Sequence, residues 1–323
     1  MGYSSYTHQT DHVLRSRNAT RGVTGQSFAY TAAIDSGTAP QQIHPLMSPR
    51  QADGTAVTRE SRDSDAHPAS VPIAVFMDIT GSMKEEPKTF QQQLPNLMRL
   101  LTQNGYLADP QVLFGAVADT SDRAVLQVGQ FESSVEIDDD LERTWLAGGG
   151  AGSASHCEAY QLVHYFALHH FRSDAWDRRQ KKGYLFTVGD ERYGDAVHPR
   201  HVREVTGDVI PSEVATRRVV AALKERWHVF HVHAQQGSYR DNQFVIGGWR
   251  ELLGEDHVIL LDQSRHVAEV IALVVGLVEG TVDMAAARVH LEQLGADADA
   301  VARIAEALGR VAARGIRIRA EAL

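Results

Sequence analysis

The chain contains 323 residues, 43% of them hydrophobic, and carries a formal net charge of −9. Its length fits one large domain with additional segments or two small domains, and its apolar fraction is sufficient for a packed core. The net negative charge argues against a general nucleic-acid-binding protein, because neutralising phosphates requires clustered Lys and Arg.

Cysteine usage and hydropathy indicate where the protein works. Cys157 is the only cysteine, so the chain can form no internal disulfide and no cysteine-rich zinc site, which fits a reducing compartment. Residues 1–11 lack the apolar stretch of a secretory signal. The most apolar later stretch, Val267–Val278, is too short to span a bilayer. We therefore expect a soluble cytoplasmic protein that binds neither membrane nor nucleic acid.

Residues 1–70 are rich in Ser, Thr, Gln, Asp and Arg and show no sustained period of 2 or 3.6. This composition favours a flexible polar tail. Tyr6, Phe28, Tyr30 and Ile43 are more aromatic and aliphatic residues than a spacer needs. The alternative is therefore a partly ordered segment that wraps along the domain or docks on a partner.

Val71–Met83 is the most informative stretch. Its apolar run stops at Asp78 and is followed by Thr80, Gly81 and Ser82. Such a run predicts a strand buried on both faces, and ligands of open α/β sheets bind just beyond the carboxyl ends of such strands. A carboxylate followed by two hydroxyls at alternate positions is a set of hard oxygen ligands, which suits Mg²⁺ or Mn²⁺.

Strands alternate with helices along the rest of the domain, which predicts a mainly parallel sheet covered on both faces. The remaining strands are expected at Val112–Ala118, Ala124–Phe131 (an antiparallel edge strand), Gly183–Gly189, Trp227–His233 and His257–Asp262. The helices are expected at Lys84–Leu101, Asp138–Trp145, Ser155–Phe171, Ser212–Arg226 (with Ser212 as N-cap), Trp249–Leu253 and Ser264–Glu279.

Residues 281–323 change in character. Two stripes of apolar residues with helical spacing lie on either side of Gly295. They predict a C-terminal helical hairpin that must bury its apolar face on the domain or on another chain. In the second case the protein would self-associate through residues 284–313.

The letters from Asp78 to Met83, DITGSM, resemble the first metal loop of von Willebrand factor A (vWA) domains, where an Asp-x-Ser/Thr-x-Ser motif forms the metal-ion-dependent adhesion site. The resemblance extends over about Val71–Gly280. It implies a three-layer, vWA/Rossmann-like α/β fold with a six-stranded sheet. The chain would then consist of the N-terminal segment 1–70, a vWA domain at 71–280 and the hairpin at 281–323.

The resemblance also implies a set of metal ligands. The first loop supplies Asp78, Thr80 and Ser82, and the third loop matches Asp190, after the strand that ends at Gly189. The second loop departs from the family, because Ala151 follows the glycines where the family usually has Thr. Weaker candidates for that position are Ser153, Ser155 and Glu158. The alternative to a metal site is a hydrogen-bonded turn in which Thr80 or Ser82 caps the following helix.

Such a site leaves one coordination position open for a carboxylate from another protein. The resemblance, which is to bacterial intracellular members of the family, therefore implies a Mg²⁺- or Mn²⁺-dependent protein–protein interaction module rather than an enzyme. Proteins of this kind act as adaptors or regulators with an ATPase, a kinase or a phosphatase. This expectation rests on analogy of fold and on a few matched residues.

A second resemblance gives an enzymatic alternative. The same motif is similar to the nucleophile loop of haloacid-dehalogenase-type phosphohydrolases, in which an Asp attacks phosphorus and Mg²⁺ balances the charge. That resemblance assigns the nucleophile to Asp78, the phosphate-orienting Lys to Lys181 or Lys182, and the acidic loop to Asp190 with Asp195. Most such phosphatases carry a second Asp two residues after the nucleophile, where this chain has Thr80.

Overall fold

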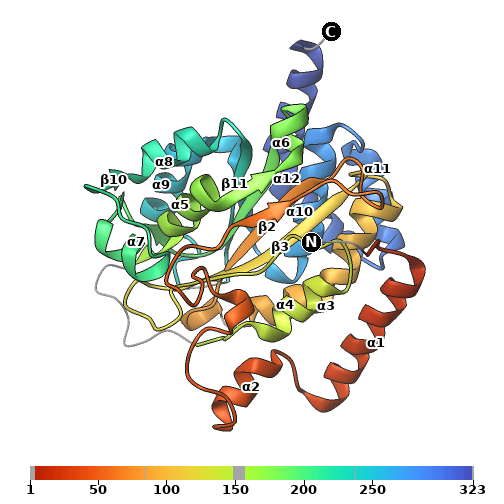
Figure 1. Cartoon of the computed structure of the whole chain (residues 1–323). Coiled ribbons are helices and arrows are strands. Elements are labelled where there is room, and N and C mark those ends of the chain that lie inside the picture. Colours follow the sequence, from red (N-terminus) through yellow and green to blue (C-terminus); the bar gives the residue numbers. More distant parts are fainter. Residues whose placement is uncertain (1–3, 84, 148–156, 237, 322–323) are drawn as a thin grey trace.

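A six-stranded sheet forms the centre of the computed structural model, which describes residues 4–83, 85–147, 157–236 and 238–321, except for the side chains of Ser82 and 314–321 (Figure 1). In spatial order the strands are β12 (Val258–Leu261), β11 (Trp227–Ala234), β7 (Gly183–Gly189), β2 (Val71–Asp78), β3 (Pro110–Val117) and β4 (Leu126–Val128). Only β4 of these runs antiparallel to its neighbour. The predicted α/β fold with one antiparallel edge strand is confirmed.

The central strand β2 is buried along its whole length, and its side chains alternate between two cores. Ile73, Val75 and Met77 belong to one core, and Ala74 and Phe76 belong to the other. Helices cover both faces and complete three layers (Figure 1). The first core is covered by α3 (Glu86–Met98), α4 (Glu136–Arg143) and α10 (Val267–Glu279), and the second by α5 (Tyr160–His170), α8 (Thr216–Leu223) and α9 (Gln243–Leu253).

Shorter elements connect these layers. A π-helical turn, Arg99–Gln103, continues α3 beyond Pro95. Three small two-stranded sheets pair β1 (Arg59–Ser61) with β6 (Phe171–Ser173), β5 (Cys157–Glu158) with β8 (Arg192–Tyr193), and β9 (Ala196–Val197) with β10 (Val214–Ala215). The remaining helices of the domain are α6 (Asp174–Arg179) and α7 (Pro199–Val205), with 3-10 turns at Gly81–Met83, Glu255–His257 and Ser264–His266.

The predicted start of the helix before β11 is wrong. Ser212 is not its N-cap: α8 begins at Thr216, after Ala215. The reason is the small β9–β10 sheet, which holds Val214 and Ala215 in an extended conformation. Thr216 then anchors the helix, because its N–H donates to Asp195 O at 2.9 Å and its hydroxyl donates to Gly194 O at 2.5 Å.

The N-terminal segment lies along the domain. It contains α1 (His8–Thr24), α2 (Ala29–Asp35) and a 3-10 turn at Pro45–Met47, and it ends in β1. Leu14 of α1 is buried in the first core, and Arg21 of α1 forms ion pairs at 2.7 Å with Asp138 and Glu142 of α4. The described part of this segment is therefore packed rather than a free tail, while the boundaries at 70 and 280 stay predictions.

The C-terminal residues form the predicted helical hairpin, α11 (Met284–Gln293) and α12 (Ala298–Glu321). Gly295 makes the turn with a φ of +90°, which residues with a Cβ rarely adopt. Ala287, Leu291, Ile304 and Leu308 are buried in the first core. Because this face is already covered within one chain, self-association through residues 284–313 would have to use other faces of the hairpin.

Hydropathy of the helices bears on membrane insertion. In the described residues, no helix combines the length and the apolar character that a bilayer crossing requires.

His164 of α5 is a fully buried histidine packed edge-on against Trp249. Neither ring nitrogen has a hydrogen-bond partner among the described residues. Burial, together with the charge of nearby Lys224, lowers the pKa of His164 from 6.5 to about 3. Between pH 6.5 and pH 3, His164 is protonated in the unfolded protein but not in the folded protein. The unfolding free energy is therefore highest above pH 6.5 and falls as the pH decreases toward 3.

We expect His164→Leu to flatten the acid dependence of stability. His164 alone should remove about 2 kcal/mol of unfolding free energy between pH 8 and pH 5. Urea unfolding at the two pH values measures this difference. The exposed His8 provides the control, since His8→Leu should keep the wild-type difference. Equal pH dependence in wild type and His164→Leu would contradict the assignment.

Candidate metal site

The first predicted loop forms a turn that is stabilised by hydrogen bonds to the buried Asp78 carboxylate. Asp78, the last residue of β2, is fully buried. The backbone N–H and the hydroxyl of Thr80 both donate to Asp78 Oδ1, each at 2.7 Å. The chain then enters the 3-10 turn Gly81–Met83, which contains Ser82, and Met83 N–H donates to Thr80 O at 2.7 Å. Thr80 does not cap the following helix, because the N-cap of α3 is Glu85.

Glu158 is the candidate that the structure brings to this turn from the second loop. Thr80 Oγ1 donates to Glu158 Oε1 at 2.9 Å, and Glu158 is 3% exposed. Its position is set by β5, which pairs with β8 just beyond β7. The other two weaker candidates, Ser153 and Ser155, lie outside the described residues.

Asp190 enters from the third loop, directly after β7. It is 2% exposed, and its Oδ2 accepts a hydrogen bond from Tyr239 N–H at 3.0 Å. The preceding residue must be glycine, since a Cβ on Gly189 would overlap Tyr160 Oη and lie 2.9 Å from Asp78 Cβ. The absence of a side chain at Gly189 therefore allows the ends of β2, β7 and α5 to meet.

Three buried oxygens at this meeting point have no hydrogen-bond partner among the described residues. They are Asp78 Oδ2, Glu158 Oε2 and Tyr160 Oη. Burial raises the pKa of the Asp78 carboxyl far above its usual range, and Asp190 and Glu191 raise it further. Burial, with Asp78 beside it, raises the pKa of Glu158 to about 10. A buried cation would supply the missing partner and offset the repulsion.

Further acidic groups surround the site. Burial, together with the charges of Asp190 and Asp119, raises the pKa of Glu191 to about 7. Asp119, which follows β3, is 6% exposed, and its Oδ2 also lacks a partner in the described structure. Tyr160 and Glu191 were not predicted, because the only sequence signal for them is that they lie next to Glu158 and Asp190 in the chain.

The donor set decides which ion fits. Among the described residues, no group of three or more His, Cys, Asp and Glu could hold a metal ion by itself. Hydrogen bonds link the carboxyls of Asp78 and Glu158 through the Thr80 hydroxyl, and the buried Asp190 carboxyl follows the neighbouring strand β7. Hard oxygen donors of this kind suit Mg²⁺ or Mn²⁺, which complete their coordination with water.

The lysines that the enzymatic alternative requires lie elsewhere. Lys181 and Lys182 precede β7, so they are at the amino edge of the parallel sheet, whereas Asp78 is at the carboxyl edge. A strand of this length separates the two edges by about 20 Å. Lys181 Nζ pairs with Glu279 at 2.8 Å, and Lys182 Nζ donates to Lys224 O at 2.7 Å. Neither lysine can orient a phosphate at Asp78.

Comparison with known proteins gives distant structural similarities only. No family model matches the chain, and no curated protein matches it. A pilus adhesin, SpaC from Lactobacillus rhamnosus GG, aligns with a TM-score of 0.43 and 9% identity over 69% of this chain and 31% of its own. Proximal thread matrix protein 1 from the mussel byssus aligns with a TM-score of 0.42 and 13% identity over 67% of this chain and 49% of its own.

A second structure of the mussel protein, described as having a zinc-occupied MIDAS motif, gives a TM-score of 0.40 and 12% identity over 68% of this chain and 46% of its own. The alignments thus span less than half of these proteins. At this level of similarity the assignment of the site depends on the residues of this chain alone.

The close approach at Gly189 can be tested by a double-mutant cycle. Gly189→Ala should reduce the unfolding free energy by about 1–3 kcal/mol, because the new methyl group overlaps Tyr160 Oη. Tyr160→Phe removes that oxygen and should recover part of the loss. Gly247→Ala is the control, since Gly247 lies in α9 with nothing within 4 Å of an added Cβ. Additive effects at 189 and 160 would show that the two groups do not meet.

Proposed function

We propose that the chain is a vWA-type module that binds another protein in a metal-dependent manner. The observation that supports it is the buried, hydrogen-bonded group of Asp78, Thr80 and Glu158 at the carboxyl edge of the sheet. Asp78 Oδ2 and Glu158 Oε2 have no partner among the described residues, and the buried Asp190 follows the neighbouring strand. Ser82 remains a predicted ligand. The bound Mg²⁺ or Mn²⁺ would supply a positively charged centre with an open coordination position.

In this proposal each residue of the site has a different role. Asp78 and Asp190 provide negative charge from two neighbouring strands, and Thr80 keeps the first loop in place through its two hydrogen bonds to Asp78. Glu158 takes the place of the usual second-loop Thr. Because Glu158 adds a carboxylate, it strengthens attraction for the cation and weakens attraction for a partner's carboxylate compared with a hydroxyl at that position.

We propose binding rather than catalysis as the outcome. The partner would complete the metal coordination with a side-chain oxygen, as a carboxylate does in the resembled family. The lone cysteine supports a reducing compartment such as the cytoplasm, where the module would act as an adaptor or regulator beside an ATPase, a kinase or a phosphatase.

Metal binding should make wild type more stable than Asp78→Asn, whereas without metal wild type should be no more stable than the variant. In Mn²⁺ at 100 times its Kd, wild type should gain about 2.7 kcal/mol of unfolding free energy and Asp78→Asn almost none. In EDTA, Asp78→Asn should be at least as stable as wild type, because it removes a buried carboxyl with an unpaired oxygen. Thermal unfolding with and without Mn²⁺ measures both. Asp35→Asn, at an exposed position, is the control. An equal gain in all three proteins would contradict the site.

Partner binding is tested by affinity capture from native lysate in Mg²⁺ and in EDTA. Wild type should retain a protein only in Mg²⁺, and Asp78→Ala and Asp190→Ala should lose it while remaining folded by circular dichroism. Glu158→Gln should need about tenfold more metal and still capture at saturation. Undiminished capture by both Ala variants, or phosphatase turnover that disappears in Asp78→Asn, would refute the module.

A further inference from the structure

A groove lined by three arginines lies away from the metal site. It has a volume of about 980 Å³ and is built from residues 41–59 of the N-terminal segment and from Arg123 in the turn between β3 and β4. Arg50, Arg59 and Arg123 line it, and the described residues of its wall include no Asp or Glu. This basic wall contrasts with the net charge of −9 of the whole chain.

None of the three arginines forms an ion pair within the described residues. Arg59 Nη2 donates to three backbone carbonyls, those of Leu46 at 2.8 Å, Ser48 at 3.2 Å and Val128 at 2.7 Å. Its Nε is buried without a partner, and burial lowers the pKa of Arg59. The Asp140 carboxylate opposes this shift and raises the pKa of Arg59, although it forms no ion pair with Arg59 among the described residues. A guanidinium without a contacting carboxylate is available for charge-assisted hydrogen bonds to an anion.

Within the described residues, the hydrogen bonds of the other two arginines also go to neutral acceptors. Arg50 Nη1 donates to the backbone carbonyl of Glu204 at 3.1 Å, and Arg123 Nη1 donates to the amide oxygen of Gln41. An adjacent, smaller cavity of about 270 Å³, which is also lined by Arg50 and Arg123, has Asp122 and Glu204 in its wall. The carboxylate of Glu204 pairs with Arg200 at 2.8 Å instead.

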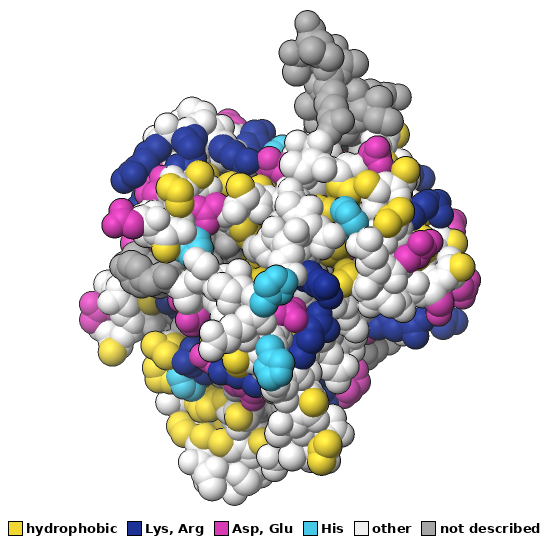
Figure 2. All heavy atoms as spheres, turned by 90° about the vertical axis from the view of Figure 1, so that its right-hand side faces the viewer, with side chains coloured by type: hydrophobic (Ala, Val, Ile, Leu, Met, Phe, Trp, Pro, Cys, Tyr) yellow, Lys and Arg dark blue, Asp and Glu magenta, His cyan; other side chains and the backbone are white. Residues whose placement is uncertain are grey.

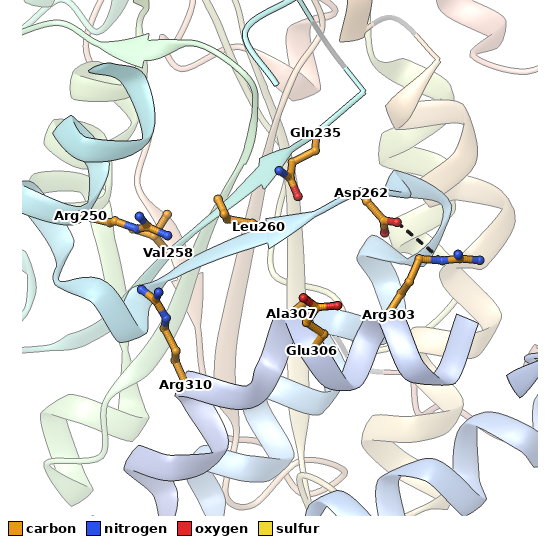
Figure 3. A pocket seen from close by; sticks show the side chains of 9 residues that line it. All are labelled: Gln235, Arg250, Val258, Leu260, Asp262, Arg303, Glu306, Ala307 and Arg310. Carbon is orange, nitrogen blue, oxygen red and sulfur yellow. Dashed lines mark ion pairs between the residues drawn. The ribbon is translucent and has the colours of Figure 1, made fainter. Parts of the chain in front are cut away.

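A second pocket is also lined by arginines, but there each arginine is paired with a carboxylate (Figure 3). Between β12 and α12, a cavity of about 510 Å³ is also lined by three arginines, Arg250, Arg303 and Arg310. Each of them pairs with a carboxylate. Arg303 pairs with Asp262 at 3.6 Å. Arg250 pairs with Glu255 at 3.3 Å, and Arg310 pairs with the same Glu255. Figure 2 likewise shows basic and acidic side chains next to one another in several places on one face of the molecule.

We infer that the N-terminal groove binds a phosphate-bearing small molecule of nucleotide size. Guanidinium groups match the geometry of phosphate oxygens, and a ligand with two or more phosphates can reach several of them. The groove is larger than a phosphate chain needs, and Ile43, Leu46 and Val57 add an apolar wall for the rest of the ligand. Its volume is within the range of small-molecule sites.

The first test is calorimetric titration of the full chain with pyrophosphate, tripolyphosphate and ATP in EDTA, which keeps phosphate–metal complexes away from the metal site. We expect saturable binding that weakens with salt. ATP should bind more tightly than tripolyphosphate because of the apolar wall, and equal affinity would overturn that part of the inference. A hexaglutamate peptide that binds as tightly as pyrophosphate would overturn the phosphate assignment.

Variants locate the binding. Arg50→Gln and Arg123→Gln should each weaken pyrophosphate binding by about tenfold, and the double variant should abolish it. Arg59 is left intact, because its bonds to three carbonyls hold the segment together. Arg217→Gln removes the same charge from the exposed face of α8 and is the control. Equal affinity in Arg217→Gln and the double variant, or no saturable binding by wild type, would refute the groove as the site.

Discussion

The burial of the Asp78 carboxyl is the constraint on which the site depends. β2 lies between β7 and β3 and is buried along its whole length, so its last side chain has no access to water. Thr80 satisfies one oxygen of that carboxyl and leaves the other unpaired. A buried, half-satisfied carboxyl is costly. The described parts of the loops after β7 and before α5 bring the carboxyls of Asp190 and Glu158 toward it. A bound cation or protons would offset the repulsion between these carboxyls.

Charge is distributed unevenly over the protein. Acidic side chains gather at the carboxyl edge of the sheet, and unpaired arginines gather in the groove of the N-terminal segment. One turn connects the two regions: Asp119 is buried near the acidic site, and Arg123 lines the groove. Asp119 N–H donates to Asp122 Oδ2 at 3.2 Å, which holds the turn together. A ligand in the groove and a cation at Asp78 would therefore both lie close to the same turn.

Both terminal segments cover an edge of the central sheet. Arg59 of the N-terminal segment donates to Val128 O of the edge strand β4. At the opposite edge, α12 packs beside β12 (Figure 3). Exposed edge strands invite pairing with other chains, so covering them protects the monomer. The segments outside the predicted vWA region thus cover both edges of the sheet. They also build walls of two cavities, one between β12 and α12 and one lined by residues 41–59.

The sequence by itself determined the sheet, the strand that carries Asp78, and the C-terminal hairpin. Each of these features follows from a local pattern. The alternation of strands and helices predicts the sheet, an unbroken apolar run predicts the strand, and apolar residues at helical spacing predict the hairpin. It also named Asp78, Thr80, Glu158 and Asp190, together with Ser153 and Ser155, which lie outside the described residues. The approach of Glu158 to Thr80 depends on β5 pairing with β8, a contact between segments about 35 residues apart that no local pattern encodes.

Other features were decided only by the tertiary structure. The start of α8 moved from Ser212 to Thr216 because a distant strand, β9, pairs with β10. The need for glycine at position 189 arises from Tyr160, which approaches from another helix. The order of the polar N-terminal segment arises from ion pairs between α1 and α4 and from the burial of Leu14. The physical reason is the same in each case: a residue's environment in the fold includes neighbours that are remote in the chain, and their packing overrides local propensity.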